Sequence, residues 1–461
     1  MKTTQCLAFG ILCVLATGLN AQTDQARLAG VVADSSGATV AGATVTLRNE
    51  KTGAIRSAVT SDNGQYLLVN LQPSDYTASA KASGLSSREY SHIPLEVGQE
   101  RTFNITVQVE SLAQTVEVSS GDLAVVDTSS AKIGVNVSER EVASLPLSGR
   151  QLSQLYLLAP GAQTAGGGSF DNIRFSGRAN QQNAVRFDGI EGSSVIDASP
   201  GNLNGETSSG FRLQASLETI QEFRVESSNY PAEFGTGTGG QISVVTKSGA
   251  NAVHGSLFEY LRNNALDARN FFDGVKKTPL RLNQYGGSLG GAIVKDKLFY
   301  FAAFEGLNQR AGVNLVATVP SAAARARGVS AIRPLLAAYP VGQTPTSNPD
   351  LELVRVSGSS PIDEDYGSLR LDYRLSDRHA FYLRYFRDQG YLQSPLDVSG
   401  SYSLVTAVPQ NAVLSYQFIA SPTVINEAKI GFNGSKTRVS GFAPAIAGID
   451  TSAFAVSFTA P

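Results

Sequence analysis

The sequence predicts a mainly β protein built from three successive parts. Glycine accounts for 45 of the 461 residues, tyrosine for 16 and phenylalanine for 21, with no tryptophan, and this composition favours strands over helices. The first quarter shows short β-rich runs between turn signals. The second half shows longer runs in which apolar and polar residues alternate. A chain of this length can hold about two to four domains, so one function need not explain all of it.

The charge balance excludes partners that bind by bulk charge. The formal net charge is -2 and only 16% of residues are charged. A nucleic-acid-binding domain needs a basic excess, which is absent. We therefore expect no nucleic acid partner.

Residues 1–21 are predicted to be a secretory signal peptide. A single positive charge, Lys2, precedes an apolar core from Cys6 to Ala16, and small residues lead to Ala21. The cleavage position is uncertain by a few residues, because Leu19 stands where a small residue is preferred. The only cysteines, Cys6 and Cys13, lie in this segment, so we expect no disulfide in the mature chain.

Residues 22–112 are predicted to form an antiparallel β-sandwich of about seven strands. Runs such as AGVVAD, ATVTLRN and QYLLVNL alternate with Gly, Asn and Asp turn signals. The stretch SDNGQYLLVNLQPSDYTASAKASGLSS resembles the carboxypeptidase regulatory-like domain, which precedes many outer-membrane proteins. None of the histidines His92, His254 and His379 has the H-x-x-E or H-E-x-x-H spacing of a zinc site. We therefore expect no metal, no cofactor, no catalytic residue and no enzyme activity.

A second domain with a different pattern is predicted over residues 121–250. Spaced leucines after Ser148-Gly149 indicate a helix that ends at Pro160-Gly161. Apolar runs at Ala184–Phe187 and Phe223–Ser227 indicate strands between glycine-rich segments. This mixture predicts a small α+β layer rather than another sandwich.

The stretch EFGTGTGGQISVVTKSG, residues 233–249, is not predicted to bind a nucleotide. A dinucleotide-binding glycine motif follows a strand and opens a helix. Here the glycines precede the strand-like residues Ile242, Val244 and Val245, and no helix signal follows before Gly249. The glycines instead indicate close backbone approach or tight bends.

Residues 251–461 are predicted to be membrane-spanning β-strands. In SLRLDYRLSDRHAFYLRYFRD, apolar residues from Leu369 to Leu375 alternate with Arg370, Asp372 and Arg374, and the alternation resumes after a polar turn. A hairpin with one lipid-facing side and one polar, lumen-facing side has this pattern. A hairpin from a soluble sandwich explains the alternation equally well. The prediction of a barrel therefore rests on the signal peptide and the domain order.

Two further stretches carry a family resemblance. The run from Leu217 to Gly255, with VRFDGI before it, is similar to the plug domain of TonB-dependent receptors, especially their Oar-like branch. The run Asn283–Gly306 resembles the opening hairpin of that branch's barrel. The resemblance implies an outer-membrane protein of a Gram-negative-type bacterium, with the glycines of residues 233–249 packed beside the barrel wall.

The resemblance also implies energised uptake of an extracellular ligand, such as a carbohydrate or a peptide. In this family a short extended segment pairs with the C-terminal domain of TonB, part of the inner-membrane TonB-ExbB-ExbD complex. Within a linker of residues 113–120, the candidate segment is Thr115, Val116, Glu117 and Val118, because it is strand-prone and precedes the plug-like region. A plain linker or a last sandwich strand would explain these residues equally well.

Ligand-binding residues are not assigned by the sequence. The Pro-, Ala- and Ser-rich span of residues 320–365 is expected to be an extracellular loop, with Arg325, Arg327 and Arg333 as solvated charges. An alternative function is a surface protein that binds carbohydrate or protein through its sandwich, without transport.

The barrel is expected to be incomplete. The 211 residues from 251 to 461 would give each of about 22 strands of a plugged transporter only about ten residues, which leaves none for loops. We therefore expect an N-terminal portion or a truncated product.

Overall fold

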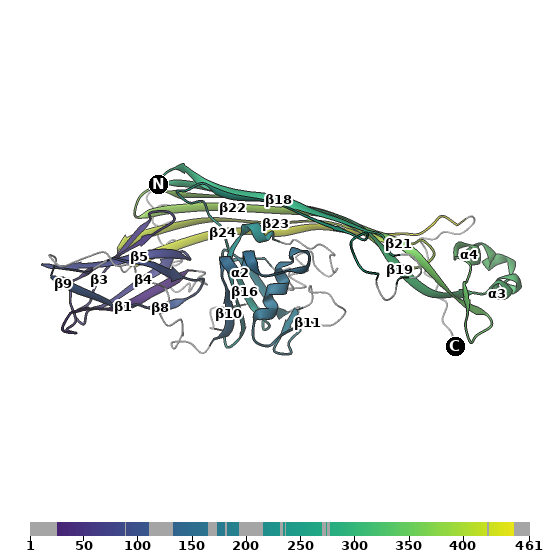
Figure 1. Ribbon diagram of the computed structural model, residues 1–461, viewed down its shortest axis with the longest axis horizontal. Coiled ribbons are helices and arrows are strands. Elements are labelled where there is room, and N and C mark those ends of the chain that lie inside the picture. The colour runs from purple at the N-terminus through teal and green to yellow at the C-terminus, as the bar shows by residue number, and fades with distance from the viewer. Residues whose placement is uncertain are drawn as a thin grey trace, which may run out of the picture.

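The computed structural model has three parts, a sandwich, an inner domain and a long strand wall that covers both (Figure 1). It describes residues 25–87, 89–109, 132–164, 173–179, 182–192, 215–230, 234–235, 237–269, 273, 277–421 and 424–446. The predicted signal peptide, the linker of residues 113–120 and the candidate segment Thr115–Val118 lie outside these ranges.

The sandwich comprises nine strands rather than about seven. They are β1 (Ala26–Asp34), β2 (Thr44–Asn49), β3 (Ile55–Val59), β4 (Gln65–Leu71), β5 (Ser74–Ala82), β6 (Leu85–Ser87), β7 (Tyr90–Leu95), β8 (Glu100–Thr102) and β9 (Ile105–Val109). Most neighbours pair antiparallel, while β1 pairs in parallel with β8 and β9. Alternate residues of each strand point inward, and Leu28, Leu47, Ile93 and Val107 are among its fully buried side chains.

The inner domain, residues 132–246, is built on a five-stranded sheet in the order β10-β15-β16-β13-β14. These strands are β10 (Ile133–Val137), β13 (Ala184–Phe187), β14 (Ile190–Glu191), β15 (Ile220–Ser228) and β16 (Gln241–Thr246), and β11 (Ala162–Thr164) pairs with β12 (Ile173–Phe175) beside them. The strands predicted at Ala184–Phe187 and Phe223–Ser227 are therefore present.

The helices of the inner domain differ from the prediction. Helix α2 (Glu139–Ser144) begins at Ser138, which forms a capping box with Glu141. The leucine-rich run predicted as one helix instead forms two 3-10 segments, η3 (Ser148–Arg150) and η4 (Leu152–Leu158), and η6 (Leu217–Thr219) is a third. Gly149 between α2 and η4 has a φ of 70°, which an α-helix cannot contain.

The strand wall is one antiparallel sheet of long strands. Its main strands are β17 (His254–Asn263), β18 (Leu280–Val294), β19 (Leu298–Pro320), β21 (Leu351–Arg374), β22 (His379–Pro395), β23 (Tyr402–Ser421) and β24 (Val424–Phe442), with the short β20 (Thr344–Pro345) beside β21. They pair in chain order from β17 to β24, and among the described residues no ladder joins these two outer strands. The wall is therefore an incomplete barrel, as the sequence predicts. The stretch expected to be its opening hairpin forms β18 and β19 instead, because β17 precedes it.

The two ends of the wall differ in the length of their connections. At the sandwich end, three residues, Lys295–Lys297, join β18 to β19, and four residues, Leu375–Arg378, join β21 to β22. At the opposite end, a span of residues 321–350 links β19 to β21 and carries α3 (Ala322–Arg327), η7 (Ser330–Ile332) and α4 (Arg333–Ala338) (Figure 1). The resemblance to TonB-dependent receptors implies short periplasmic turns and longer extracellular loops, so we infer that the sandwich end is the periplasmic end.

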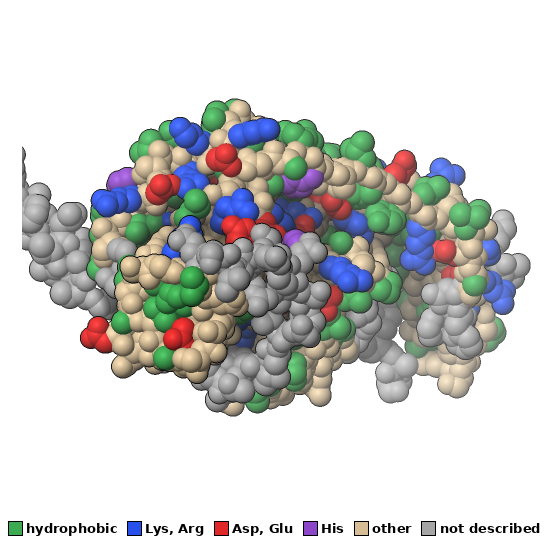
Figure 2. Space-filling view, turned by 60° about the vertical axis from the view of Figure 1, so that its left-hand side comes forward, with side chains coloured by type: hydrophobic (Ala, Val, Ile, Leu, Met, Phe, Trp, Pro, Cys, Tyr) green, Lys and Arg blue, Asp and Glu red, His purple; other side chains and the backbone are tan. Residues whose placement is uncertain are grey.

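The alternation predicted for residues 369–385 is present. Leu369, Tyr373 and Leu383 are exposed on the outer face, whereas Arg370 and Arg384 are buried on the inner face. Figure 2 shows that Lys and Arg side chains on one face of the molecule are interspersed with Asp and Glu side chains, so this face is neither wholly basic nor wholly acidic. Among the described residues, none of the helices has the length and apolar character needed to cross a membrane.

Candidate functional site

The inner domain packs its hydrophobic core directly against the inner face of the strand wall. Val185, Phe187 and Val244 belong to one buried cluster with Tyr366 and Phe386 of the wall. The rings of Phe187 and Phe386 meet edge to face at 5.3 Å between centroids. The inner domain thus occupies the side of the wall that becomes the lumen of a closed barrel.

A buried polar cluster holds the same interface together around Asp188. Arg384 donates from Nε to Asp188 Oδ2 at 2.9 Å, and Thr246 donates to both carboxylate oxygens from its backbone N-H at 2.9 Å and its hydroxyl at 2.8 Å. Arg370 Nη1 lies 3.5 Å from Asp188 Oδ1. Burial alone would raise the pKa of Asp188, but the two guanidinium groups and the Thr246 hydrogen bonds outweigh it, so the pKa lies below its ordinary value.

The backbone explains why an aspartate stands at position 188. Asp188 and Gly189 have φ angles of 51° and 82° and form the tight turn between β13 and β14. Asp and Gly tolerate this left-handed region, so the turn needs no metal. The turn aims the carboxylate at the wall, where Arg384 also donates to the Phe187 carbonyl oxygen at 3.0 Å.

A second polar cluster centres on Arg150 and Glu305. Arg150 donates to Glu218 Oε1 at 2.8 Å and lies 3.4 Å from Glu305 Oε1, while its guanidinium stacks 4.2 Å from the Phe258 ring centroid. Glu305, fully buried in β19, also accepts a hydrogen bond from Gln284 at 2.7 Å. The η3 segment, where the sequence predicted a regular helix, places Arg150 at this interface.

The sandwich contacts both other parts at its β2–β3 turn. Lys51 Nζ lies 3.2 Å from Glu139 of α2, and the Lys51 carbonyl oxygen accepts the Asn251 N-H at 3.0 Å. The Gly53 carbonyl oxygen accepts a hydrogen bond from Arg374 of β21 at 3.4 Å. One turn therefore contacts α2, the connection into the wall and the periplasmic end of a wall strand.

A buried carboxylate lies where the sandwich meets the inner-domain sheet. The Val97 N-H donates to Glu222 of β15. Burial raises the pKa of Glu222 to about 8, and the nearby Glu96 carboxylate adds to the rise. Burial also raises the pKa of Glu96. This junction is therefore sensitive to pH.

The glycines of residues 233–249 serve packing, but mostly inside the inner domain. A Cβ on Gly240 would lie 2.3 Å from the Phe175 ring, and one on Gly239 would lie 2.4 Å from Asn183 Oδ1. Only Gly249 approaches the wall, where a Cβ would lie 2.4 Å from the Tyr300 carbonyl oxygen. The expectation that the whole run packs beside the wall is thus wrong for Gly239 and Gly240.

Of the three arginines expected to be solvated charges, Arg325 is instead partly buried and holds the long span together, whereas Arg327 and Arg333 remain exposed. Arg325 donates to four carbonyl oxygens, those of Pro320, Leu336, Tyr339 and Pro340. Arg327 pairs with Asp350, and Arg333 donates to the Gly328 carbonyl oxygen at 3.0 Å.

The three histidines lie far from one another in the fold. His92 pairs with Glu50 in the sandwich, the His254 ring lies beside Phe301, and the His379 ring stacks on Phe418 at 4.9 Å. Within the described ranges, no group of three or more His, Cys, Asp and Glu side chains is placed to hold a metal ion.

Two family matches and one relative agree with this architecture. Residues 27–108 match the carboxypeptidase regulatory-like domain, and residues 245–334 and 326–458 match the outer membrane beta barrel domain. The TonB-dependent transporter Oar of Myxococcus xanthus is 28% identical over 268 residues, which cover 54% of this chain and 23% of Oar. Over these residues the chain is similar to the TonB-dependent transporter Oar, and it spans about a quarter of the length of Oar. Its outer membrane beta barrel domain places it in the outer membrane.

Solved structures similar to this chain are also outer-membrane transporters or receptors. YddB of Escherichia coli is 15% identical, with 65% of this chain and 38% of that chain covered and a TM-score of 0.46. The alcaligin receptor FauA of Bordetella pertussis is 10% identical, with 68% and 49% covered and a TM-score of 0.37. The siderophore receptor PirA of Acinetobacter baumannii is 16% identical, with 67% and 44% covered and a TM-score of 0.38.

Sequence reasoning missed the residues that seat the inner domain of this chain. From the sequence, Asp188 is only part of an Asp-Gly turn signal and Arg370 only one of the polar residues that alternate along a strand. The two paired residues lie 182 positions apart in the sequence, so no local pattern reveals their contact. The available signal was the type of residue, because arginines in strands that face a lumen need an acidic partner.

Proposed function

We propose that this chain acts as an outer-membrane receptor for energised uptake of an extracellular ligand. The packing of the inner domain against the inner face of the strand wall supports this proposal most. An apolar core and the Asp188 and Glu305 clusters hold that domain on the inner face of the wall. Uptake requires a domain that blocks the lumen of the barrel at rest and can be displaced when energy is supplied.

The polar character of the two clusters favours a domain that can move. Buried ion pairs contribute less net stability than well-packed apolar groups, because both charges lose their water. A polar interface can be rehydrated when the domain shifts, at lower cost than exposing apolar surface. The inner domain would therefore act as the plug, displaced from the wall as a ligand enters.

Energy would enter through Thr115, Val116, Glu117 and Val118. This segment follows the sandwich, which we infer to lie at the periplasmic end, where the C-terminal domain of TonB can reach. Pairing as an added strand uses backbone hydrogen bonds, so a short β-branched sequence suffices. Force on the segment would pass along the chain to the inner domain, whose first described strand is β10.

The ligand would enter from the end that carries the span of residues 321–350. No covalent chemistry is proposed, and the ligand class is open between carbohydrate, peptide and other small molecules. The alternative, a surface protein that binds through its sandwich, is less well supported, because the sandwich lies at the periplasmic end. Proteinase added to intact cells separates the two functions. The structure shortens the expected loop of residues 320–365 to residues 321–350, because β21 begins at Leu351. Cleavage confined to residues 321–350 favours the receptor, and uniform cleavage from residue 22 favours the alternative.

Binding to TonB tests the proposal directly. The full chain in detergent is titrated calorimetrically with purified TonB C-terminal domain. Val116→Pro removes a backbone donor and the strand geometry, so binding is lost, whereas Val116→Ala changes affinity by less than about threefold. Unchanged affinity for the proline variant would show that the contact lies elsewhere. Melting of the sandwich in that variant would show that these residues are its last strand.

A further inference from the structure

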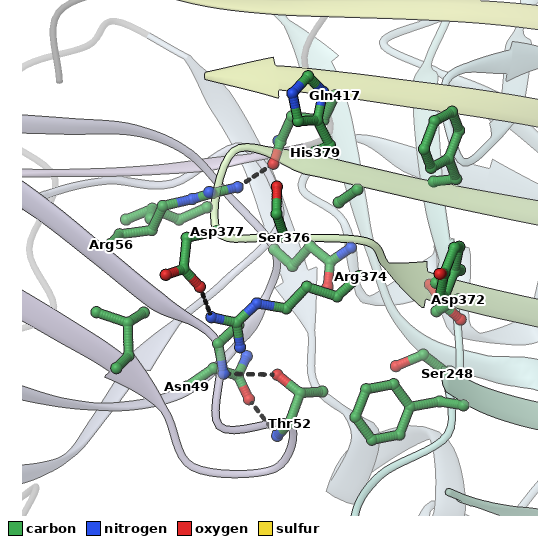
Figure 3. A pocket seen from close by; sticks show the side chains of 18 of the residues that line it. Asn49, Thr52, Arg56, Ser248, Asp372, Arg374, Ser376, Asp377, His379 and Gln417 are labelled. Carbon is green, nitrogen blue, oxygen red and sulfur yellow. Dashed lines mark hydrogen bonds and ion pairs between the residues drawn. The ribbon is translucent and has the colours of Figure 1, made fainter. Parts of the chain in front are cut away.

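A cavity lies between the sandwich and the periplasmic end of the strand wall. Sandwich residues on one side include Asn49, Thr52 and Arg56, and wall residues on the other include Arg374 and Gln417 (Figure 3). Its volume is about 100 Å³, several times what one water molecule needs. Such a space admits a small ion.

The charged side chains around this cavity are mainly basic. Arg56, Arg374 and Arg378 line it, against the carboxylates of Asp372 and Asp377. Arg370 already binds Asp372 through three hydrogen bonds of 2.9 to 3.2 Å. Asp377 contacts Arg374 from an exposed position, where solvent weakens its charge. The lining therefore has an excess of positive charge.

Two guanidinium groups face this space from different parts of the molecule. Figure 3 shows Arg56 reaching in from the sandwich and Arg374 from the wall. Burial lowers the pKa of Arg56, and the nearby charge of Arg374 lowers it further. The two charges therefore repel each other across the junction of the sandwich with the wall.

Arg56 has more donors than partners. A guanidinium carries five N-H donors, and within the described part of the chain Arg56 donates to one acceptor, the Gln417 side chain. Arg374 donates to the Gly53 carbonyl oxygen and to Asp377. Donors of both residues thus remain available at the cavity.

We propose that this cavity binds a small oxyanion, such as a phosphate group, which bridges Arg56 of the sandwich and Arg374 of the wall. A tetrahedral oxyanion offers several acceptor oxygens, and planar guanidinium forks match them in pairs. The bound anion neutralises the repulsion between the two arginines. It therefore fastens the sandwich to the wall at the periplasmic end.

Calorimetric titration of inorganic phosphate into the full chain in detergent tests the site. We expect one saturable site per chain that chloride at equal ionic strength does not reproduce. Arg56→Gln weakens phosphate binding at least tenfold. The matched control Arg27→Gln, an exposed sandwich arginine paired with Glu100 at 3.0 Å, changes it less than twofold. The absence of a saturable site, or equal affinity in Arg56→Gln, would overturn the proposal.

A second variant keeps the test decisive if Arg56→Gln fails to fold. Asp377 is 83% exposed and competes for Arg374, so Asp377→Asn removes a competing carboxylate without disturbing the fold. We expect this variant to bind phosphate several-fold more tightly than the parent chain. Unchanged or weaker binding by a variant with the parent's circular dichroism spectrum would contradict the proposal.

The source of the phosphate group is decided by competition. Phosphatidylglycerol is added to the detergent micelles, with diacylglycerol as the uncharged control. Displacement of inorganic phosphate by phosphatidylglycerol alone assigns the group to a lipid headgroup. Without displacement, the ligand is the free ion. Either outcome keeps the site, whereas equal effects of the two lipids would show that phosphate binding depends on the micelle and would overturn the proposal.

Discussion

Arg384 of the strand wall and Asp188 of the inner domain form an ion pair of 2.9 Å in which neither side chain is more than 4% exposed. The two residues lie 196 positions apart in the sequence, and both are satisfied by further hydrogen bonds. This pair joins the inner domain to the wall.

Removing the wall side of the pair is expected to loosen the inner domain. Arg384→Ala leaves the Asp188 carboxylate buried with fewer hydrogen-bond donors. The free energy of unfolding of the inner domain should therefore fall by about 3–5 kcal/mol. The matched control Arg387→Ala, on the exposed side of the same strand, costs less than about 0.5 kcal/mol. Denaturant titration followed by proteolysis of residues 132–246 measures both, and equal effects would refute the role of the pair.

The junction of the sandwich with the inner domain is expected to weaken as pH rises. A carboxyl group whose pKa is raised by folding keeps its proton in the folded state, so its stabilising effect is complete below pH 4.5 and is lost toward pH 8. The loss is at most about 1.4 kcal/mol per pH unit. Melting temperatures of the full chain between pH 5 and pH 8 should therefore fall.

Glu222→Gln removes most of that pH dependence, and the remainder belongs to Glu96, whose pKa is raised in the same direction. Glu100→Gln on the exposed sandwich surface serves as the control and should retain the parent profile. A Glu222→Gln variant whose melting temperature keeps the parent's pH dependence would show that Glu222 does not cause the pH dependence of this junction.

The connection from the inner domain into the wall is expected to require glycine at position 249. A Cβ there would lie 2.4 Å from the Tyr300 carbonyl oxygen and 2.6 Å from that of Gly291, and neither backbone can move freely within the sheet. Gly249→Ala should cost about 1–3 kcal/mol. Gly367→Ala, where a Cβ meets nothing within 4 Å, should be neutral or slightly stabilising. Thermal unfolding of the two variants in parallel tests this, and equal melting temperatures would contradict it.

The long span at the opposite end is expected to depend on one arginine. Arg325 satisfies four carbonyl oxygens, so Arg325→Ala should open residues 321–350 to thermolysin, which cleaves before apolar residues such as Leu336, and shorten their half-life at least fivefold. Arg327→Ala removes only an exposed pair with Asp350 and should have little effect. Similar cleavage before Leu336 in both variants would refute the difference.

Much of the fold could be predicted because its signals are local. Alternation around Arg370 shows which side of a strand is apolar, and the Asn-Gly turn at Asn63 marks the boundary between β3 and β4 of the sandwich. The helix predicted after Ser148-Gly149 is the 3-10 segment η4 rather than an α-helix, and the sequence missed this because spaced leucines look alike in both helix types.

The candidate site was less predictable because its partners are distant in sequence. Nothing near Asp188 indicates Arg384, and nothing near Gly240 indicates Phe175. Only the packing of one domain against another brings these residues together. The glycine run could be recognised as a packing feature, but its neighbours could not be inferred from the sequence.

The orientation of the wall is tested most directly by labelling single cysteines in intact cells. The native cysteines, Cys6 and Cys13, both precede residue 21. Ala326→Cys places an exposed thiol in the long span, and Lys295→Cys places one in a short turn at the sandwich end. A membrane-impermeant maleimide should label position 326 in intact cells and position 295 only after the outer membrane is permeabilised. Labelling of position 295 in intact cells would place the sandwich outside, beyond the reach of TonB, and would contradict the receptor account.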